Sequence, residues 1–308
     1  CAAGCGNSGS SSSNDSNDSS AAGDSTELVI GGIGPVTGDY AVYGTAVQNG
    51  AQVAVDEINA AGGVNGFTFK LDFQDSQGSP DNATAAYGKL MDSGMVLSLG
   101  GTLSGETAAV VAAAKEDGIL VLTPSGSSKA AIAGSDTAFR VCFNDPAQGK
   151  ASADYIAQYS LAQKVAVFYA SDNDYSVGLY QTFKDECDVK GIEIVDTQTF
   201  TDSTKTDFST QIASIKNSGA ELVFLPIYSA EASIFLTQAY GVIPDGTLYF
   251  GADGMDGILT DIDDPAKAEN VFLLTPFSVD DASEKVQSFV KTYTDNYSIA
   301  PNQFAADA

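Results

Sequence analysis

The feature that most constrains the fold is a regular alternation between apolar runs of strand length and longer segments with helical periodicity. The first apolar run covers residues 28–33. Residues 43–61 follow, with apolar side chains spaced three and four apart, and Gly62-Gly63 then supplies a helix stop. This alternation is typical of βαβ units and predicts an α/β fold with mainly parallel sheets.

The alternation of strands and helices continues to about residue 140 and then starts a second series, which predicts two Rossmann-like lobes. Further strands of the first lobe are expected at 67–73, 96–99 and 119–122, with helices at 81–92 and 106–116. In the second lobe, strands are expected at 165–169, 192–196, 222–225 and 248–250, with helices at 147–159, after Tyr175, around 208–215 and at 230–239. A length of 308 residues suits two domains, because single cores rarely grow beyond roughly 250 residues.

The last part of the chain is expected to return to the first lobe. Residues 271–274 are predicted to lead the chain back, followed by helices at 282–297 and from 303. The resulting domains are a tether at 1–27, a discontinuous first lobe at 28–145 plus 275–308, and a second lobe at 146–274. More than one connecting strand would join the lobes, as a hinged clamp requires.

The charge and the missing residue types exclude several classes of protein. The chain has 40 acidic and 14 basic residues and a net charge of -26, so nucleic acid would be repelled and we expect no nucleic-acid partner. Histidine, the commonest general base and zinc ligand, is absent. The run Gly32 to Thr37 fails the dinucleotide pattern because it ends in Thr and contains Pro35. We therefore expect no enzyme, no cofactor and no metal site.

The N-terminal segment predicts a covalent membrane anchor. No apolar run reaches the roughly 18 residues that span a bilayer. Residues 1–27 are a small, polar stretch that starts at Cys1 and resembles a mature bacterial lipoprotein, with its signal peptide removed and a lipid on Cys1. The alternative is that Cys1 is merely where the sequence starts. A disulfide between Cys142 and Cys187 remains open.

Two loops rich in glycine and hydroxyl groups mark a candidate binding site. GGTLSG at 100–105 follows the strand at 96–99, and TPSGSS at 123–128 follows the strand at 119–122. Ligands bind beyond the carboxyl ends of parallel strands, where backbone N–H groups and Ser104, Ser125, Gly126 and Ser127 can meet an anion. Both loops suit a carboxylate, although ordinary capping would use the same residues.

The second lobe offers different groups at the equivalent strand ends: Tyr175, Tyr228 and Asp253. Aromatic walls with one carboxylate suit an apolar side chain and an ammonium group. Each tyrosine taken alone also fits simple packing.

Six motifs carry a resemblance to a known family. In chain order they are IGPVTGDYAVYG, DEINAAGGVNG, GGTLSGETAAV, EDGILVLTPSGSS, DYSVGL and FGADG. Together they resemble the motifs of the leucine/isoleucine/valine-binding protein family. The resemblance runs from about residue 28 to 308 and implies the type I periplasmic-binding-protein fold and the solute-binding component of an ABC importer. Such a protein would lie outside the cytoplasm, act as a monomer, and deliver a branched-chain amino acid to a membrane permease.

The resemblance also implies roles for individual residues. Ser104 and Ser127 would bind the ligand α-carboxylate, while the Ser125 and Ser127 carbonyls and the Asp253 carboxylate would bind the α-ammonium. Tyr43, Tyr175 and Tyr228 would line the cleft.

The chain departs from the family pattern at several points. Asp253 stands where the family has Glu, the loop at 125–127 is more polar than expected, and the first-lobe cysteine pair is missing. Compared with the family, the sequence ends about one crossover short, which should leave the second lobe without its last segments. Amides, urea or aromatic acids remain alternative ligands, and a ligand-sensing ectodomain remains an alternative function.

Overall fold

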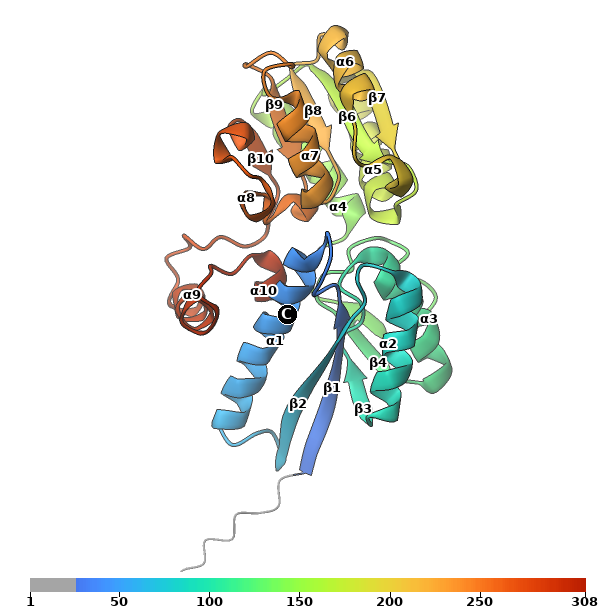
Figure 1. Ribbon diagram of the computed structural model, residues 1–308, viewed down its shortest axis with the longest axis vertical. Helices are drawn as coiled ribbons and strands as arrows, with labels where there is room; N and C mark the ends of the chain where they lie inside the picture. Colours follow the sequence, from blue (N-terminus) through green and yellow to red (C-terminus); the bar gives the residue numbers. More distant parts are fainter. Residues whose placement is uncertain (1–25) are drawn as a thin grey trace, which may run out of the picture.

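The computed structural model describes residues 26–308 and has two five-stranded parallel sheets, one in each lobe (Figure 1). The expected α/β architecture is therefore confirmed. Cys1, Cys5 and nearly all of the expected tether lie outside the described residues. The first strand begins at Thr26, two residues before the position expected from the sequence.

The first sheet has the strand order β2-β1-β3-β4-β5. Its strands are β1 (Thr26–Gly34), β2 (Phe67–Asp75), β3 (Met95–Ser98), β4 (Leu120–Thr123) and β5 (Ala138–Arg140). Its helices are α1 (Ala41–Ala60), α2 (Pro80–Asp92) and α3 (Ser104–Asp117). All strand pairs are parallel, so their carboxyl ends meet at one edge, which faces the second lobe. Strand β5 was not expected, because three residues are too short to show a pattern.

The second sheet has the order β10-β9-β8-β6-β7. Its strands are β6 (Lys164–Ala170), β7 (Glu193–Phe200), β8 (Leu222–Leu225), β9 (Leu248–Gly251) and β10 (Val271–Leu273). The helices of this lobe are α4 (Asp145–Gln158), α5 (Asp174–Lys190), α6 (Ser209–Ser218), α7 (Ser229–Ala239) and the single turn α8 (Ile258–Asp261). Short 3-10 helices at Asp202–Thr204, Asp253–Met255 and Pro265–Ala268 complete it.

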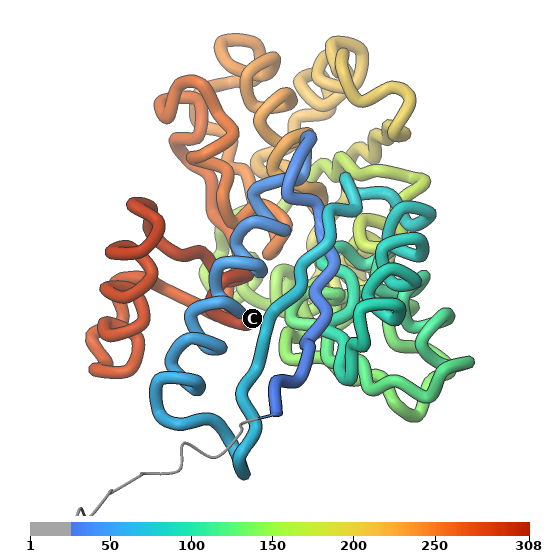
Figure 2. Tube along the Cα trace, turned by 60° about the horizontal axis from the view of Figure 1, so that its bottom comes forward, coloured from blue at the N-terminus to red at the C-terminus, as the bar shows by residue number. Residues whose placement is uncertain are grey.

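The prediction that residues 271–274 lead back to the first lobe is wrong. Strand β10 pairs in parallel with β9, with Val271 opposite Tyr249, and so forms the edge of the second sheet. The return comes after it. Helices α9 (Glu284–Tyr297) and α10 (Gln303–Asp307) then pack beside α1, as the red and blue segments of Figure 2 show.

Local sequence signals explain where the helices begin and end. The Asn173 side chain accepts a hydrogen bond from the Ser176 N–H at 3.2 Å and caps the start of α5. Gly191 ends this helix in the left-handed conformation with φ 72°, which glycine adopts without steric cost. These signals place Tyr175 in the first turn of α5, at the face toward the first lobe.

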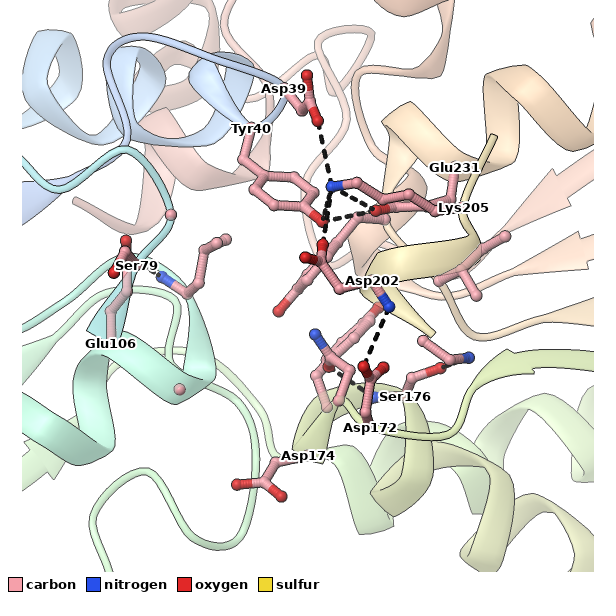
Figure 3. Close-up of a pocket in the computed structure, with 18 of the residues that line it drawn as sticks. Asp39, Tyr40, Ser79, Glu106, Asp172, Asp174, Ser176, Asp202, Lys205 and Glu231 are labelled. Atoms are coloured by element: carbon pink, nitrogen blue, oxygen red, sulfur yellow. Dashed lines mark hydrogen bonds and ion pairs between the residues drawn. The ribbon is translucent and has the colours of Figure 1, made fainter. Parts of the chain in front are cut away.

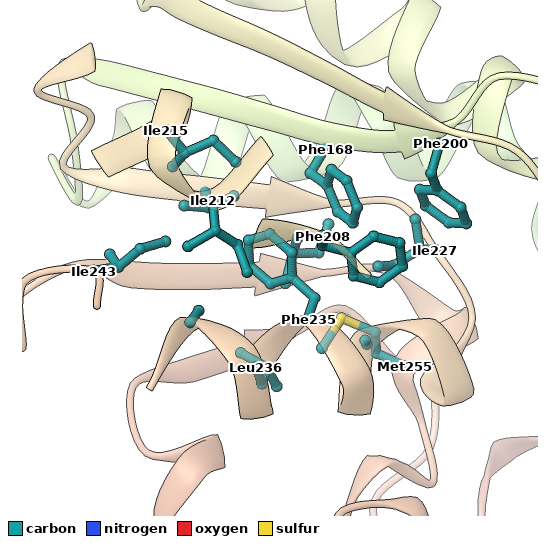
Figure 4. Close-up of a cluster of buried hydrophobic side chains, with 14 of the residues drawn as sticks. Phe168, Phe200, Phe208, Ile212, Ile215, Ile227, Phe235, Leu236, Ile243 and Met255 are labelled. Atoms are coloured by element: carbon teal, nitrogen blue, oxygen red, sulfur yellow. The ribbon is translucent and has the colours of Figure 1, made fainter. Parts of the chain in front are cut away.

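A cluster of aromatic and aliphatic side chains fills the space between the second sheet and helices α6 and α7 (Figure 4). Phe168 from β6 lies at its centre, with ring centroids 5.0 Å from Phe200, 4.8 Å from Phe208 and 4.7 Å from Phe235. All four side chains are buried. This packing makes the second lobe a rigid support for the residues at its strand ends.

The described residues also show the state of two cysteines and whether any helix could span a membrane. Cys142 and Cys187 are both buried and free, so the disulfide left open by the sequence is absent. Across residues 26–308, no helix has both the length and the apolar character needed to cross a membrane.

Candidate functional site

The predicted site residues come together in one buried cavity between the lobes. Seven of the eight predicted residues line it: Tyr43, Ser104, Ser125, Ser127, Tyr175, Tyr228 and Asp253. Gly126 lies in the same loop but does not line the cavity. The sequence missed four further lining residues: Thr102, Leu103, Gly254 and Phe304.

The first of the two loops of the first lobe is held by hydroxyl groups. The Thr107 hydroxyl shares its one proton between the carbonyls of Gly101 at 2.7 Å and Leu103 at 2.9 Å. The Ser125 hydroxyl donates to the Thr102 carbonyl at 2.6 Å, which ties the two loops together. The Ser104 hydroxyl accepts from the Ser128 N–H at 3.1 Å. Its own proton is therefore free to meet a ligand oxygen.

The second loop depends on a glycine and on an arginine that the sequence analysis overlooked. A Cβ on Gly126 would lie 2.5 Å from the Thr107 hydroxyl oxygen, so only glycine fits there. Arg140, from β5, donates through Nη1 to the carbonyls of Gly126 at 2.9 Å, Ser127 at 2.6 Å and Ser128 at 3.0 Å. It is the sole arginine of the chain, a signal that could have drawn attention to it.

These contacts change one expected role. The Ser127 carbonyl accepts from the Asp145 N–H at 3.1 Å as well as from Arg140, so both of its lone pairs are used. It has no capacity left for a ligand ammonium. The Ser127 hydroxyl lines the cavity and keeps the capacity to bind an anion.

Asp253 is the carboxylate of the cavity and is held by neutral partners. It is 2% exposed, and its Oδ1 accepts from the Tyr175 hydroxyl at 2.8 Å. The Gln303 amide lies 3.5 Å from Oδ2, while the Asp253 N–H donates to the Gln148 side chain at 3.1 Å. Burial raises the pKa of Asp253 to about 6, and the bond from Tyr175, followed by the nearby Gln148 side chain, opposes that shift.

A second buried carboxylate lies behind the cavity. Asp145 is fully buried, and neither of its oxygens has a hydrogen-bond partner among the described residues. Burial, followed by the charge of Asp253, raises its pKa well above the usual value, and the Ser127 side chain and Arg140 oppose this. The interior between the lobes is thus an environment that favours a positive charge.

Tyrosines from both lobes build the wall opposite the serines. Tyr175 and Tyr228 stack at 4.9 Å with an interplanar angle of 6°. Tyr43, from α1, lies 5.5 Å from Tyr228 and accepts from the Ser229 N–H at 2.7 Å. Its hydroxyl donates to the Gly254 carbonyl. These bonds join the first lobe to the second, so the structure is a closed form.

The closed cavity is too small for an amino acid. Its volume is about 10 Å³, room for roughly one water molecule. A ligand can enter only if the lobes separate. Beyond Leu103, Tyr175 and Tyr228 the cleft widens into a chamber of 620 Å³, which is called the outer chamber below (Figure 3).

The described residues contain no cluster of acidic or cysteine side chains suited to hold a metal ion. The groups that converge are instead hydroxyls, one free carbonyl, a buried carboxylate and aromatic rings. This set binds polar and charged groups by hydrogen bonds and contains no nucleophile with an adjacent base.

The chain resembles known proteins along most of its length. A family model described as periplasmic binding protein matches residues 27–308. The Leu/Ile/Val-binding protein homolog 3 of Brucella melitensis is 33% identical over 215 residues, covering 70% of this chain and 58% of that protein. The chain thus spans less than two thirds of the length of the first curated relatives, 58% and 62% for two of them.

Solved structures share the two-lobed architecture. The branched-chain amino acid transporter substrate binding protein LivJ from Streptococcus pneumoniae, in complex with isoleucine, has a TM-score of 0.85 and 31% identity, covering 92% of this chain and 80% of that one. An ABC-transporter solute binding protein from Rhodopseudomonas palustris, in complex with 3,4-dihydroxy benzoic acid, has a TM-score of 0.80 at 19% identity, covering 91% and 77%. The second likeness shows the fold alone.

Proposed function

Because the chain belongs to the periplasmic-binding-protein family, we propose that it is the extracytoplasmic solute-binding component of an ABC importer for free amino acids, with branched-chain aliphatic side chains preferred. It binds and releases its ligand and carries out no reaction. Its partner would be the membrane permease of that importer, which it would meet as a monomer.

The observation that carries this proposal is the polarity of the inner cavity. Ser104 and Ser127 offer hydroxyl donors from the first lobe, and Asp253 offers a buried carboxylate from the second. A ligand with a carboxylate at one end and an ammonium two bonds away satisfies both. The Ser125 carbonyl, which accepts no bond among the described residues, takes a second ammonium proton.

The ligand side chain then meets a mostly apolar wall. Leu103, Tyr228 and Phe304 line the part of the cavity that the polar groups leave free. An uncharged aliphatic side chain fits that wall better than a charged one, because a charge there would lose its hydration without gaining a partner.

Binding would proceed by hinge closure. We propose that residues 28–145 with 275–308, and residues 146–274, move as two bodies. The described chain crosses between the sheets in two places, after β5 and after β10. The ligand would bind the loops of the first lobe, and Tyr175, Tyr228 and Asp253 would close over it to give the form that a permease recognises.

A thermal-shift panel tests the proposal, since any ligand that binds only the native state raises its melting temperature. Leucine, isoleucine and valine should raise it, and urea, short amides and benzoate should not. Stabilisation by benzoate or urea alone would keep solute binding and overturn the amino-acid assignment.

A further inference from the structure

Three residues separate the inner cavity from the outer chamber. Leu103, Tyr175 and Tyr228 line both spaces, so each presents one side to the ligand and the other to the chamber. A ligand side chain that grows past this wall would enter the chamber. What stands at that boundary decides how long the side chain can be.

Tyr40 lines the outer chamber directly behind Tyr228 and is fixed by residues of the opposite lobe. Its ring lies edge-on to Tyr228, with centroids 5.3 Å apart. Its hydroxyl donates to Oε1 of Glu231 at 2.6 Å and accepts from Nζ of Lys205 at 3.2 Å. Lys205 also lies 4.9 Å from the centre of the Tyr40 ring. Figure 3 shows this group at the edge of the chamber.

The two residues that hold Tyr40 are themselves anchored. Glu231 is 4% exposed, at the start of α7, and its second oxygen has no partner among the described residues. Lys205 forms ion pairs with Asp39 at 3.1 Å and Asp202 at 3.0 Å. Contacts to charged and buried groups hold a side chain more firmly than contacts to water.

The outer chamber is strongly acidic. Six carboxylates line it against the single cation Lys205: those of Asp39, Glu106, Asp172, Asp174, Asp202 and Glu231. An anionic group entering the chamber would be repelled, and a guanidinium or ammonium group would be attracted. The chamber therefore suits the end of a long cationic side chain, and Tyr228, backed by Tyr40, stands between it and the inner cavity.

We propose that Tyr40, held across the cleft by Glu231 and Lys205, is a positioning residue that keeps Tyr228 in the wall between the two spaces, and so restricts the ligand to short aliphatic side chains and keeps long cationic ones out of the acidic chamber. This inference rests on the proposed function, because it concerns the side chain of an amino acid held by Ser104 and Asp253. It explains how an acidic cleft can serve a neutral ligand: the acidic part lies behind the wall that Tyr40 supports.

The side chain of Tyr40 can be changed without disturbing the helix that it precedes. It occupies the position before α1 and forms no capping bond with its side chain. Tyr40→Ala would remove the ring that packs against Tyr228, which would free Tyr228 to move and let the two spaces join. Tyr40→Phe would keep the ring against Tyr228 and lose only the bonds to Glu231 and Lys205.

The test is a calorimetric titration of both variants and the unchanged protein with leucine, arginine and glutamate. The quantity that decides is the ratio of the dissociation constants for arginine and leucine. We expect leucine to bind the unchanged protein at least 100-fold more tightly than arginine. In Tyr40→Ala this ratio should fall at least tenfold, while glutamate gains nothing. In Tyr40→Phe the ratio should fall by less than in Tyr40→Ala, because the ring still packs on Tyr228 while the bonds to Glu231 and Lys205 are lost.

Tyr240→Ala, which changes an exposed tyrosine far from the cleft, is the matched control and should leave the ratio unchanged. A purely structural role for Tyr40 would weaken all ligands alike, so an unchanged ratio in Tyr40→Ala would overturn the inference. If Tyr40→Ala did not fold, Tyr40→Leu would replace it, because leucine is also too short to reach Glu231. The same fall in the ratio of the arginine and leucine dissociation constants is then expected. An unchanged protein that binds no amino acid would instead overturn the proposed function and this inference with it.

Discussion

Replacing the carboxylate of Asp253 by an amide should stabilise the empty protein and weaken ligand binding at the same time. Burial raises the pKa of Asp253 from 3.8 to about 6. A raised pKa means that the folded protein favours the protonated form. The contribution of Asp253 to stability is then fully present below pH 4 and is lost as the pH rises through 6. Two pKa units correspond to about 3 kcal/mol, which the charged Asp253 costs the empty protein at pH 7.5.

Asp253→Asn removes this cost while keeping the shape of the side chain. The amide oxygen of the substituted side chain can still accept from Tyr175. Its amide nitrogen can donate to the Gln303 side-chain oxygen if the Gln303 amide group rotates by half a turn. That oxygen has no partner among the described residues. The free energy of unfolding should rise by about 2 to 3 kcal/mol at pH 7.5 and change little at pH 4.

Ligand binding should respond in the opposite direction. Truncating one partner of a buried charge pair costs about 2 to 5 kcal/mol, which corresponds to a loss of roughly 30- to 4,000-fold in leucine affinity. Urea unfolding at pH 4 and pH 7.5, with calorimetry for leucine, measures both effects. Asp185→Asn, at an exposed carboxylate of the same lobe with no ion pair among the described residues, is the matched control and should change neither quantity. Unchanged leucine affinity in Asp253→Asn would refute the ammonium role.

Three further predictions concern the support of the site. Arg140→Ala should weaken leucine binding about tenfold or more, because three loop carbonyls lose a charged donor, and calorimetry would measure it; binding equal to that of the unchanged protein contradicts this role. Gly126→Ala should lower the unfolding free energy by about 1 to 3 kcal/mol because its Cβ meets Thr107, and denaturant titration checks it. Cys142 and Cys187 should resist iodoacetamide in the native protein and react in denaturant, since both are buried and the pKa of Cys187 is raised to about 12; peptide mapping that finds them joined would show the free state to be wrong.

Most of the fold could be predicted from the sequence because each helix and strand carries its own local pattern. The family resemblance is likewise confirmed by the match over residues 27–308. Strand β5 escaped because three residues at a sheet edge show no alternation. Strand β10 was seen but assigned the wrong role, since its own residues do not reveal that β9 is its neighbour.

The site could be predicted in part for a simple reason. Parallel strands place their carboxyl ends at one edge, so loops such as 100–105 and 123–128 had to lie together. Residues that reach the cavity from elsewhere carried no such signal. Phe304 comes from the last helix, and Arg140 acts from the unexpected strand β5. The double use of the Ser127 carbonyl is a matter of three-dimensional contact that no sequence pattern encodes.

Recognition of both the ammonium and the carboxylate of an amino acid is tested most directly by a calorimetric titration with leucine and three analogues that each lack one polar or charged feature. These are 4-methylpentanoate, which has no ammonium, 3-methylbutylamine, which has no carboxylate, and leucinamide, which has no negative charge. We expect one leucine bound per chain and a loss of at least 100-fold for every analogue, because each leaves Asp253 or the serine loops without a partner. Equal binding of leucine and 4-methylpentanoate would contradict this expectation.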